Sequence, residues 1–393
     1  MKKMYSYMIS TILGLSLLLV GCNKATQRYF DNQPENIKDG LEVGTLEEVN
    51  IDSKLLEKAV SRIIRGKYDE VHSMLILKDN KLVFEAYFPG HKYQWDAADH
   101  KGEWAEWDKN MPHIIMSATK SVTSTCIGIA IDKGLIESVD QSIFDYLPAH
   151  QYLKSNGRDK ITIEHLLTMN SGLEWDEWGT QLNNPDNDLI ALSFNCEDII
   201  NCILDVPLVH NPGENFTYSG GNMIVLGEIL KNATNLPIDE FSKEYLFEPL
   251  GIYSSDWSER YDNGVIYAGG GIMITPRDMM KIGVTFLNNG IFNGNQIISN
   301  EWIEKCTTQY SNNTNIDIPG HESGSHGYSY SWWLKTYSKS GYDINMYHAL
   351  GWGGQEVMIL PELNTVVVFT GGTYTSNVKV FDILENYIIP SIN

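Results

Sequence analysis

Basic residues are scarce in this chain compared with acidic ones. Its 393 residues include 29 Lys and Arg against 50 Asp and Glu, which gives a formal net charge of −21. A protein that binds nucleic acid needs clustered cations to neutralise phosphates, so this balance argues against nucleic acid as a partner. It favours a soluble surface that repels copies of itself.

Long hydrophobic runs are also lacking, apart from Ile9 to Val20, which is too short to span a bilayer comfortably. Lys2 and Lys3 precede this run, and it ends in Leu19-Val20-Gly21-Cys22, which resembles the cleavage motif of bacterial lipoproteins. We expect residues 1–21 to be a signal peptide and Cys22 to carry lipid, which would anchor an extracytoplasmic protein to a bacterial membrane. The alternative is an ordinary signal peptide with an incidental cysteine.

Cysteine is rare, and only four remain after Cys22. Cys196 and Cys202 lie in an apolar stretch that we interpret as helix, where six residues span about 9 Å, beyond the reach of a disulfide. Cys126 falls on the opposite helix face from Ser117, and we expect it in the core. The sequence therefore predicts no structural disulfide and no cysteine metal site.

The histidine-containing stretch from His321 to His326 is one residue longer than the zinc motif H-E-x-x-H and is rich in glycine. No G-x-S-x-G motif is present, so the sequence does not support an α/β-hydrolase. We expect neither a metal nor a cofactor.

Polar residues dominate 22–50, and this composition predicts a flexible tether. Helical spacing then covers 51–65, and two strand-like runs, 73–78 and 81–88, flank Asp79-Asn80 as in a hairpin. Helix signals dominate from Ser117 to about residue 251. Further strand-like runs at 356–360 and 365–370 precede a closing helical segment, 378–389.

This order predicts an α/β fold of the α+β type, in which helices flank an antiparallel sheet and a large, mainly helical sub-domain is inserted. We place the helical sub-domain at about 117–262, and the α/β sub-domain at about 51–116 and 263–393. The segment 90–112 carries Trp95, Trp104 and Trp107 just before Ser117. It is either a lip over a site or a surface loop held by its tryptophans.

The strongest chemical signal is Ser117-Ala118-Thr119-Lys120. If a helix begins near Ser117, Lys120 lies one turn further on the same face and next to the hydroxyl. A neutral amine can take the proton of an alcohol, provided that burial or nearby cations lower the lysine pKa from about 10.4. The motif is short, and its second copy, Ser376-Asn377-Val378-Lys379, is interpreted as coincidence.

Two further blocks follow, Phe216-Thr217-Tyr218-Ser219-Gly220-Gly221-Asn222 and His348-Ala349-Leu350-Gly351-Trp352-Gly353-Gly354-Gln355. The three blocks in this order resemble the serine β-lactamase and penicillin-binding-protein superfamily. The class C-like branch is the most similar, and it also holds esterases, D-amino-acid-specific peptidases and 6-aminohexanoate-dimer hydrolases. The resemblance extends over most of residues 70–390 and includes Gly269-Gly270-Gly271.

The resemblance implies a β-lactamase-like fold and a serine hydrolase without a cofactor, acting on a small ester, amide or short peptide. Ser117 is similar to the acylated nucleophile and Lys120 to its base. Tyr218 is similar to the tyrosine of Y-x-N, which relays the proton and would be helped if Lys120 lowered its pKa. The backbone N–H groups of Ser117 and Trp352 would hold the oxyanion, and Gly351 would let substrate approach closely.

Two positions depart from the family pattern. Gly220 stands where Y-x-N has asparagine, and Asn222 is an open candidate to replace it. Leu350 stands where K-T-G has its lysine, so a cation for a β-lactam carboxylate is missing, and His348 is either a ligand or a structural residue. Alternatives to a general esterase or amidase are a D-amino-acid-specific cell-wall peptidase and a penicillin-binding-like sensor that is acylated without turnover.

Overall fold

The computed structural model describes residues 26–30, 33–182, 184–310, 312–339 and 342–392. The expected signal peptide and the expected lipid-bearing Cys22 lie outside these residues. In the described part of the chain, no helix is both long and apolar enough to cross a membrane.

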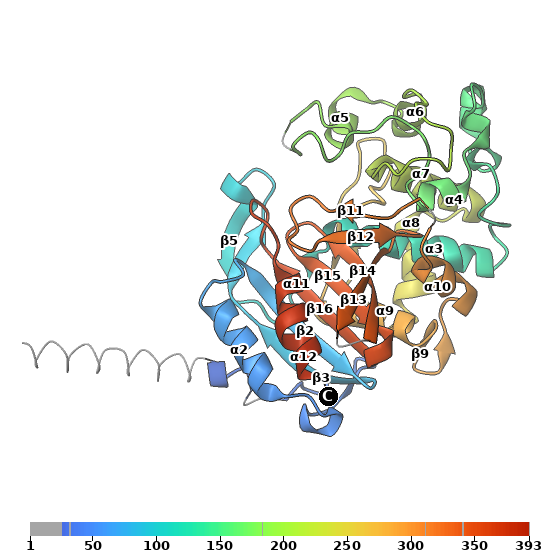
Figure 1. Ribbon diagram of the computed structural model, residues 1–393. Helices are drawn as coiled ribbons and strands as arrows, with labels where there is room; N and C mark the ends of the chain where they lie inside the picture. Colours follow the sequence, from blue (N-terminus) through green and yellow to red (C-terminus); the bar gives the residue numbers. More distant parts are fainter. Residues whose placement is uncertain (1–25, 31–32, 183, 311, 340–341, 393) are drawn as a thin grey trace, which may run out of the picture.

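Among the described residues, the largest unit is a nine-stranded sheet with the order β1-β3-β2-β16-β15-β14-β13-β12-β11 (Figure 1). Every neighbouring pair is antiparallel except β1 with β3, which is parallel. The strands are β1 (Glu42–Val43), β2 (Val71–Lys78), β3 (Lys81–Tyr87), β11 (Ile316–Asp317), β12 (Ser325–Tyr328), β13 (Trp333–Lys339), β14 (Tyr342–Gly351), β15 (Gln355–Leu360) and β16 (Thr365–Gly371). The predicted fold class, a mainly antiparallel sheet flanked by helices, is confirmed.

The β2–β3 hairpin turns at Asp79 and Asn80, as predicted. Their φ angles are 52° and 61°, the left-handed conformation that a two-residue type I′ turn requires at both central positions. Asn and Asp enter this region more readily than other residues with a Cβ. The local sequence therefore fixes the pairing next to the turn, Lys78 with Lys81 and Leu77 with Leu82, and an irregularity between Ile76 and Leu77 shifts the register beyond it.

Helices cover both faces of the sheet. Gly283 of α9 (Pro276–Leu287) lies against Val357 and Val366, because a Cβ at position 283 would come within 2.6 Å of Val366 Cγ1. On the other face, Phe381 of α11 (Val380–Ile383) packs 5.4 Å from the ring of His348. Helices α2 (Ser53–Ile64) and α12 (Ile389–Ser391) lie beside α11 (Figure 1).

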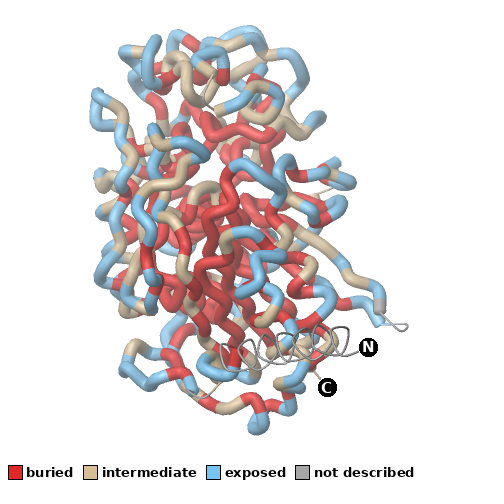
Figure 2. Tube along the Cα trace, turned by 90° about the vertical axis from the view of Figure 1, so that its left-hand side faces the viewer, coloured by how far each residue is buried: buried red, intermediate tan, exposed pale blue. Residues whose placement is uncertain are grey.

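The helical block lies above the sheet in Figure 1. It comprises α3 (Thr119–Asp132), α4 (Ile163–Leu167), α5 (Asp188–Asn195), α6 (Ile199–Leu204), α7 (Gly220–Thr234) and α8 (Ile238–Ser242), while α10 (Asn300–Thr307) packs at its lower edge. Buried segments run through the centre of the molecule from the sheet into this block (Figure 2).

Helix α3 is buried on all sides from Thr119 to Ala130, including the polar residues of that stretch. The hydroxyl of Thr123 donates to the carbonyl of Ala268 at 2.7 Å, and that of Ser124 donates to the carbonyl of Tyr330 at 2.8 Å. Buried hydroxyls are tolerated when they find acceptors in this way. These bonds hold the start of α3, and with it Ser117, between the block and the sheet.

The prediction of a flexible tether is wrong for residues 33–50, although these residues are mostly polar. Leu41, Leu46 and Val49 are buried against the domain, and β1 extends the sheet next to β3. A few apolar side chains suffice here because each one enters the core, which composition alone does not reveal.

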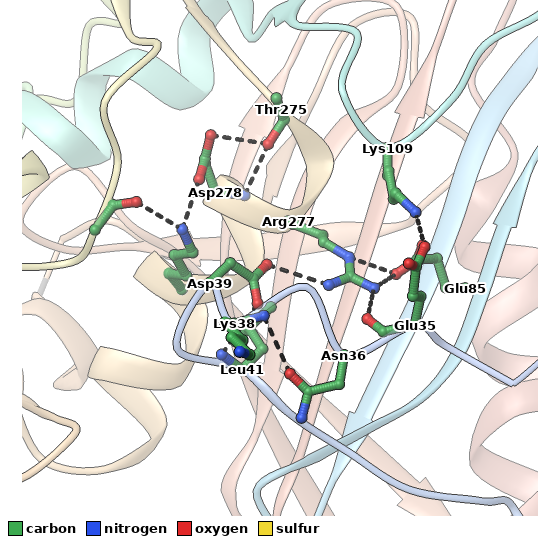
Figure 3. A network of polar contacts seen from close by, with 12 residues as sticks. Glu35, Asn36, Lys38, Asp39, Leu41, Glu85, Lys109, Thr275, Arg277 and Asp278 are labelled. Atoms are coloured by element: carbon green, nitrogen blue, oxygen red, sulfur yellow. Dashed lines mark hydrogen bonds and ion pairs between the residues drawn. The ribbon is translucent and has the colours of Figure 1, made fainter.

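A buried arginine holds the same segment (Figure 3). Arg277 of α9 is 2% exposed and donates to Glu85 at 2.6 Å, to Asp39 at 3.2 Å and to the carbonyl oxygen of Glu35 at 2.8 Å. Each oxygen compensates part of the cost of burying the guanidinium. Two residues of the expected tether, Glu35 through its carbonyl and Asp39 through its carboxylate, are therefore partners of this side chain.

The prediction of no disulfide is also wrong, because Cys196 and Cys202 are bonded with their Cα atoms 6.2 Å apart. They do not share one helix. Helix α5 ends at Asn195, Cys196 has an extended backbone, and Asp198 caps the start of α6. The break brings the cysteines closer than a continuous helix would. Cys126 is free and buried in the core, as predicted.

Candidate active site

Ser117 and Lys120 meet at the start of α3. Ser117 lies in a 3₁₀ turn, Met116–Ala118, that leads directly into the helix. The Nζ of Lys120 is 3.0 Å from the Oγ of Ser117 and 2.8 Å from the carbonyl oxygen of Gly269. The amine thus lies beside the hydroxyl, as the spacing predicts.

The backbone just before the serine is strained. Met116 has a φ of 47°, a left-handed conformation that costs a residue with a Cβ about 1–3 kcal/mol. Such strain persists only where the surroundings fix it, and it is common at functional sites. The conformation of Met116 directs the backbone so that Ser117 lines a cavity while Ala118 is buried in the core.

Burial lowers the pKa of Lys120 to about 8, and the carboxylates of Glu177 and Glu259 raise it against that effect. The side chain is 1% exposed. With a pKa near 8, about one amine in ten is neutral at pH 7, and that form can accept a proton. The pKa shift that the motif requires is therefore present.

Tyr218 packs over the lysine, with its ring centroid 4.8 Å from Nζ, and stacks on Trp178 at 4.6 Å. Burial raises its pKa well above the ordinary 10, Glu177 raises it further, and an interaction with the Ser117 hydroxyl lowers it. The expected lowering by Lys120 is not found. The phenol therefore stays protonated near neutral pH and is suited to donate a proton rather than to remove one.

Gly351 and Trp352 lie at the end of β14, beside the serine segment. A Cβ on Gly351 would lie 2.2 Å from the carbonyl oxygen of Ile115, so the glycine lets the strand approach the turn that holds Ser117. This differs from the expected role, which was close approach of substrate. The indole of Trp352 lines the cavity and donates to the carbonyl of Tyr374 at 3.0 Å.

A cavity of about 510 Å³ opens in front of Ser117. Tyr93 and Trp95, from the tryptophan-rich segment, line it together with Trp352. Trp107 instead stacks 3.8 Å from the ring of His113 inside the protein. One part of the segment is therefore a lip over the cavity, and another part is held by a buried tryptophan.

Sequence reasoning missed two carboxylates in this cavity, those of Glu177 and Glu259. Glu177 Oε2 accepts from the backbone N–H of Gly220 at 2.5 Å and from the indole of Trp175 at 3.0 Å. A Cβ on Gly220 would lie 3.0 Å from that oxygen, so Glu177 borders the space that the asparagine of Y-x-N would enter. In the sequence, the only indication of the Glu177 carboxylate is Gly220, which stands where Y-x-N has asparagine. Asn222 is buried, with its amide against Met169, and does not line the cavity.

His348 is a structural residue. It is fully buried, and its two ring nitrogens lie 3.1 Å from Glu356 Oε2 and 3.2 Å from His326 Nδ1. In the second S-x-x-K, Ser376 bonds to Asp69 at 2.6 Å instead of contacting a lysine amine.

Comparison with known proteins gives one family and several relatives. The model of the family described as Beta-lactamase matches residues 61–380. The chain is 23% identical over 263 residues to a 6-aminohexanoate-dimer hydrolase of Paenarthrobacter ureafaciens, which covers 65% of each protein. The chain spans about half to two thirds of the length of several of the curated relatives it matches.

Solved structures share the fold. A penicillin-binding protein homologue from Pyrococcus abyssi superimposes with a TM-score of 0.59 at 20% identity, covering 82% of this chain and 74% of that one. A family VIII carboxylesterase superimposes with a TM-score of 0.60 at 15% identity, covering 83% and 92%. At these identities the likeness shows the fold alone.

Proposed function

Because the chain belongs to the beta-lactamase family, we propose that it is a serine hydrolase that cleaves a small ester or amide through an acyl-enzyme. One observation carries the proposal: the buried amine of Lys120, with its pKa lowered to about 8, lies 3.0 Å from the hydroxyl of Ser117. An alcohol becomes a nucleophile when a base of this kind stands next to it.

Acylation begins with attack by Ser117 Oγ on the substrate carbonyl carbon, while neutral Lys120 takes the hydroxyl proton. The oxyanion forms between the backbone N–H groups of Ser117 and Trp352, at the start of the helix and the end of β14. The bond to the leaving group then breaks. The protonated phenol of Tyr218 gives the leaving group a proton and recovers one from the Lys120 ammonium.

Deacylation reverses these roles with water as the attacking group. Water adds to the ester carbonyl of the acyl-enzyme and loses a proton to the neutral amine of Lys120. The bond to Ser117 Oγ then breaks, and Oγ takes that proton from the Lys120 ammonium and leaves as the alcohol. Each step uses only side chains and backbone groups of this chain. The chain is also similar in sequence to a 6-aminohexanoate-dimer hydrolase, and it shares its fold with a carboxylesterase, which supports a small amide or ester as the substrate.

We also propose an extracytoplasmic location with a lipid on Cys22. The apolar run and the cysteine that follows it support this location. The Cys196–Cys202 disulfide supports it independently, because disulfides persist mainly in oxidising compartments.

A fluorophosphonate probe and a p-nitrophenyl ester assay test the proposed chemistry together. The wild-type chain should be labelled on Ser117 and should hydrolyse the ester, and Ser117→Ala should abolish both. Ser376→Ala is the matched control, since it removes the serine of the second motif and should change neither. Labelling without turnover would favour the penicillin-binding-like sensor, and labelling of another serine would refute the assignment.

A further inference from the structure

Two carboxylates face the cavity that Ser117 lines, and the proposed chemistry uses neither. Glu177 is oriented by two N–H groups that both bind its Oε2. Among the described residues, no donor is bonded to the carboxylate of Glu259. Burial raises the pKa of Glu259 and Lys120 lowers it. A carboxylate in this state gains most from a cation beside it.

Glycines make room for both acids. A Cβ on Gly220 would lie 3.0 Å from Glu177 Oε2, and a Cβ on Gly271 would lie 2.9 Å from the Cβ and Cγ of Glu259. Gly271 also has a φ of 88°, which strains any residue with a side chain. The two acidic side chains therefore occupy places shaped by the surrounding backbone.

The cations near the cavity are already engaged. Among the described residues that line it, Arg260 is the basic one, and it bonds to Asp239 at 2.5 Å. Lys120 is buried beneath the cavity and donates to Ser117 and to the carbonyl of Gly269. The charges that remain available to a substrate in the cavity are therefore the negative charges of Glu177 and Glu259.

Aromatic rings supply the rest of the wall. Tyr93, Trp95, Tyr261, Tyr267 and Trp352 line the same cavity as the two acids. Aromatic faces attract cations, and aromatic rings combined with carboxylates form the usual surroundings of a bound organic ammonium ion. An anionic substrate would meet both the carboxylates and the negative faces of these rings.

We propose that the cavity selects substrates that carry an aliphatic ammonium group, and that Glu177 and Glu259 determine this specificity. The proposal rests on the proposed serine hydrolase and names the class of its substrate. The ammonium lies between the two carboxylates while the reacting carbonyl lies at Ser117.

Selection and catalysis are coupled through Lys120. Glu177 and Glu259 raise the pKa of Lys120, which keeps more of its amine protonated at neutral pH. An ammonium bound beside them offsets their charge, so the pKa of Lys120 falls and more of the base is neutral. A cationic substrate therefore helps to generate the form of the lysine that acylation needs, and a neutral substrate does not.

Isosteric esters test the selection in the full-length chain. One substrate is the p-nitrophenyl ester of a trimethylammonio-pentanoate, and the other has carbon in place of the ammonium nitrogen. The leaving group and shape are the same, so the ratio of their kcat/KM values, corrected for spontaneous hydrolysis, reports the charge. We expect the cationic ester to be favoured by at least about tenfold, the size of one cation–aromatic or carboxylate contact. Equal values would overturn the proposal.

The variants Glu177→Gln and Glu259→Gln should lower kcat/KM for the cationic ester but not for the neutral ester. Loss of either carboxylate weakens recognition of the cationic ester. It also lowers the pKa of Lys120, so hydrolysis of the neutral ester at pH 7 should stay equal or rise. Glu174→Gln removes the same charge from a neighbouring exposed position outside the cavity and should change neither value. An equal loss with both esters, accompanied by a trapped acyl-enzyme, would assign the glutamate to deacylation and overturn the proposal.

A binding measurement separates this inference from the proposed function. Butyltrimethylammonium should quench the fluorescence of the cavity tryptophans in wild type, in Ser117→Ala and in Glu174→Gln, and should not do so in the Glu177→Gln/Glu259→Gln double variant. If the ion binds in this pattern but no ester is hydrolysed, the cation site stands and the serine hydrolase fails. If esters are hydrolysed but the ion does not bind, the hydrolase stands and the cation site fails.

Discussion

The amine of Lys120 lies 3.0 Å from the hydroxyl of Ser117, in a place that leaves 1% of the lysine exposed. One turn of helix brings the two groups together, and burial makes the amine a weaker base than a lysine in water. The carbonyl of Gly269, 2.8 Å from Nζ, keeps the amine in position in either protonation state. The three-residue spacing of Ser117 and Lys120 therefore leads to a pH dependence of hydrolysis that can be measured.

Hydrolysis of a neutral ester should increase with pH through about 8, the pKa of Lys120. Below that pH the amine is mostly protonated and cannot accept the proton of Ser117, so kcat/KM should fall about tenfold for each unit of pH. The measurement is kcat/KM for p-nitrophenyl butyrate from about pH 6 to pH 9, at the isosbestic wavelength of the product. Lys120→Met should remove the activity and the titration together. A flat profile would exclude Lys120 as the base.

Gly351→Ala should disable the site more than it destabilises the fold. Its Cβ would lie 2.2 Å from the carbonyl oxygen of Ile115, so β14 must move away from the turn that holds Ser117. Misplacement of catalytic groups by about 1 Å costs on the order of a hundredfold in rate, and we expect kcat/KM to fall by that amount.

The control for this variant is Gly66→Ala. Gly66 also has an unusual φ, 72°, but nothing lies within 4 Å of the added Cβ, and the position is remote from the cavity. It should cost stability without a change in kcat/KM. Thermal unfolding measured beside the kinetics separates the two effects, and full activity of Gly351→Ala would mean that β14 does not position the serine.

The sequence predicts those parts of this protein that depend on neighbouring residues. The turn at Asp79-Asn80 involves adjacent residues, and it is found. The contact between Ser117 and Lys120 is also predictable from the sequence, because a single helical turn joins the two residues. Tyr218, Gly351 and Trp352 could be placed only through a resemblance, since nothing local brings them to the serine.

The parts that the sequence did not predict depend on contacts between distant segments. Glu177 and Glu259 enter the cavity from two loops more than eighty residues apart and belong to no motif. The burial of Leu41 and the partners of Arg277 depend on tertiary packing that composition does not report. The Cys196–Cys202 bond was missed because α5 stops at Asn195, within an apolar stretch that carries no glycine or proline to mark a break.

Arg277→Met should strongly destabilise the protein. The guanidinium is 2% exposed, and its removal would leave the carboxylate of Glu85 buried without its partner. Breaking a buried ion pair in this way costs about 3–5 kcal/mol, which urea unfolding would measure. The double variant Arg277→Met/Glu85→Gln should recover part of the loss, since it removes one of the two carboxylates, those of Glu85 and Asp39, that lose their partner.

The matched control is Lys67→Met, which breaks an ion pair with Asp382 whose side chains are 43% and 38% exposed. Exposed pairs contribute less than about 1 kcal/mol, so this variant should unfold close to wild type. If Arg277→Met lowered the free energy of unfolding no more than Lys67→Met does, the Arg277 network would not anchor residues 33–50.

Cys22→Ser should release the protein from membranes. The residue lies outside the described part of the chain, and the prediction rests on the sequence around it. Fractionation of cells into membrane and supernatant, with incorporation of a labelled fatty acid, measures the effect. Cys202→Ser is the control, because it removes the disulfide but leaves the proposed anchor. A Cys22→Ser protein that still sediments with membranes would require another means of attachment.

Penicillins and cephalosporins should be poor substrates, because the described residues that line the cavity offer no unpaired cation for their carboxylate. Leu350 replaces the lysine of K-T-G and is buried. His348 is enclosed and bonded to Glu356, and Arg260 is paired with Asp239, so neither is available. A lost charge-assisted contact is worth about 1.5–3 kcal/mol, and each 1.4 kcal/mol is about tenfold in rate.

The two carboxylates in the cavity add repulsion to that loss. Glu177 and Glu259 both line the space in front of Ser117, where a β-lactam would have to place its own negative charge. We therefore expect kcat/KM for nitrocefin to be at least about a hundredfold below that for p-nitrophenyl butyrate. In the Glu177→Gln/Glu259→Gln double variant, kcat/KM for nitrocefin should rise relative to that for p-nitrophenyl butyrate, because the repulsion is gone. Nitrocefin should remain the poorer substrate, because Leu350 still offers no cation. If wild type prefers nitrocefin, the end of β14 holds the β-lactam carboxylate in a way that needs no lysine, and the role given to Leu350 is wrong.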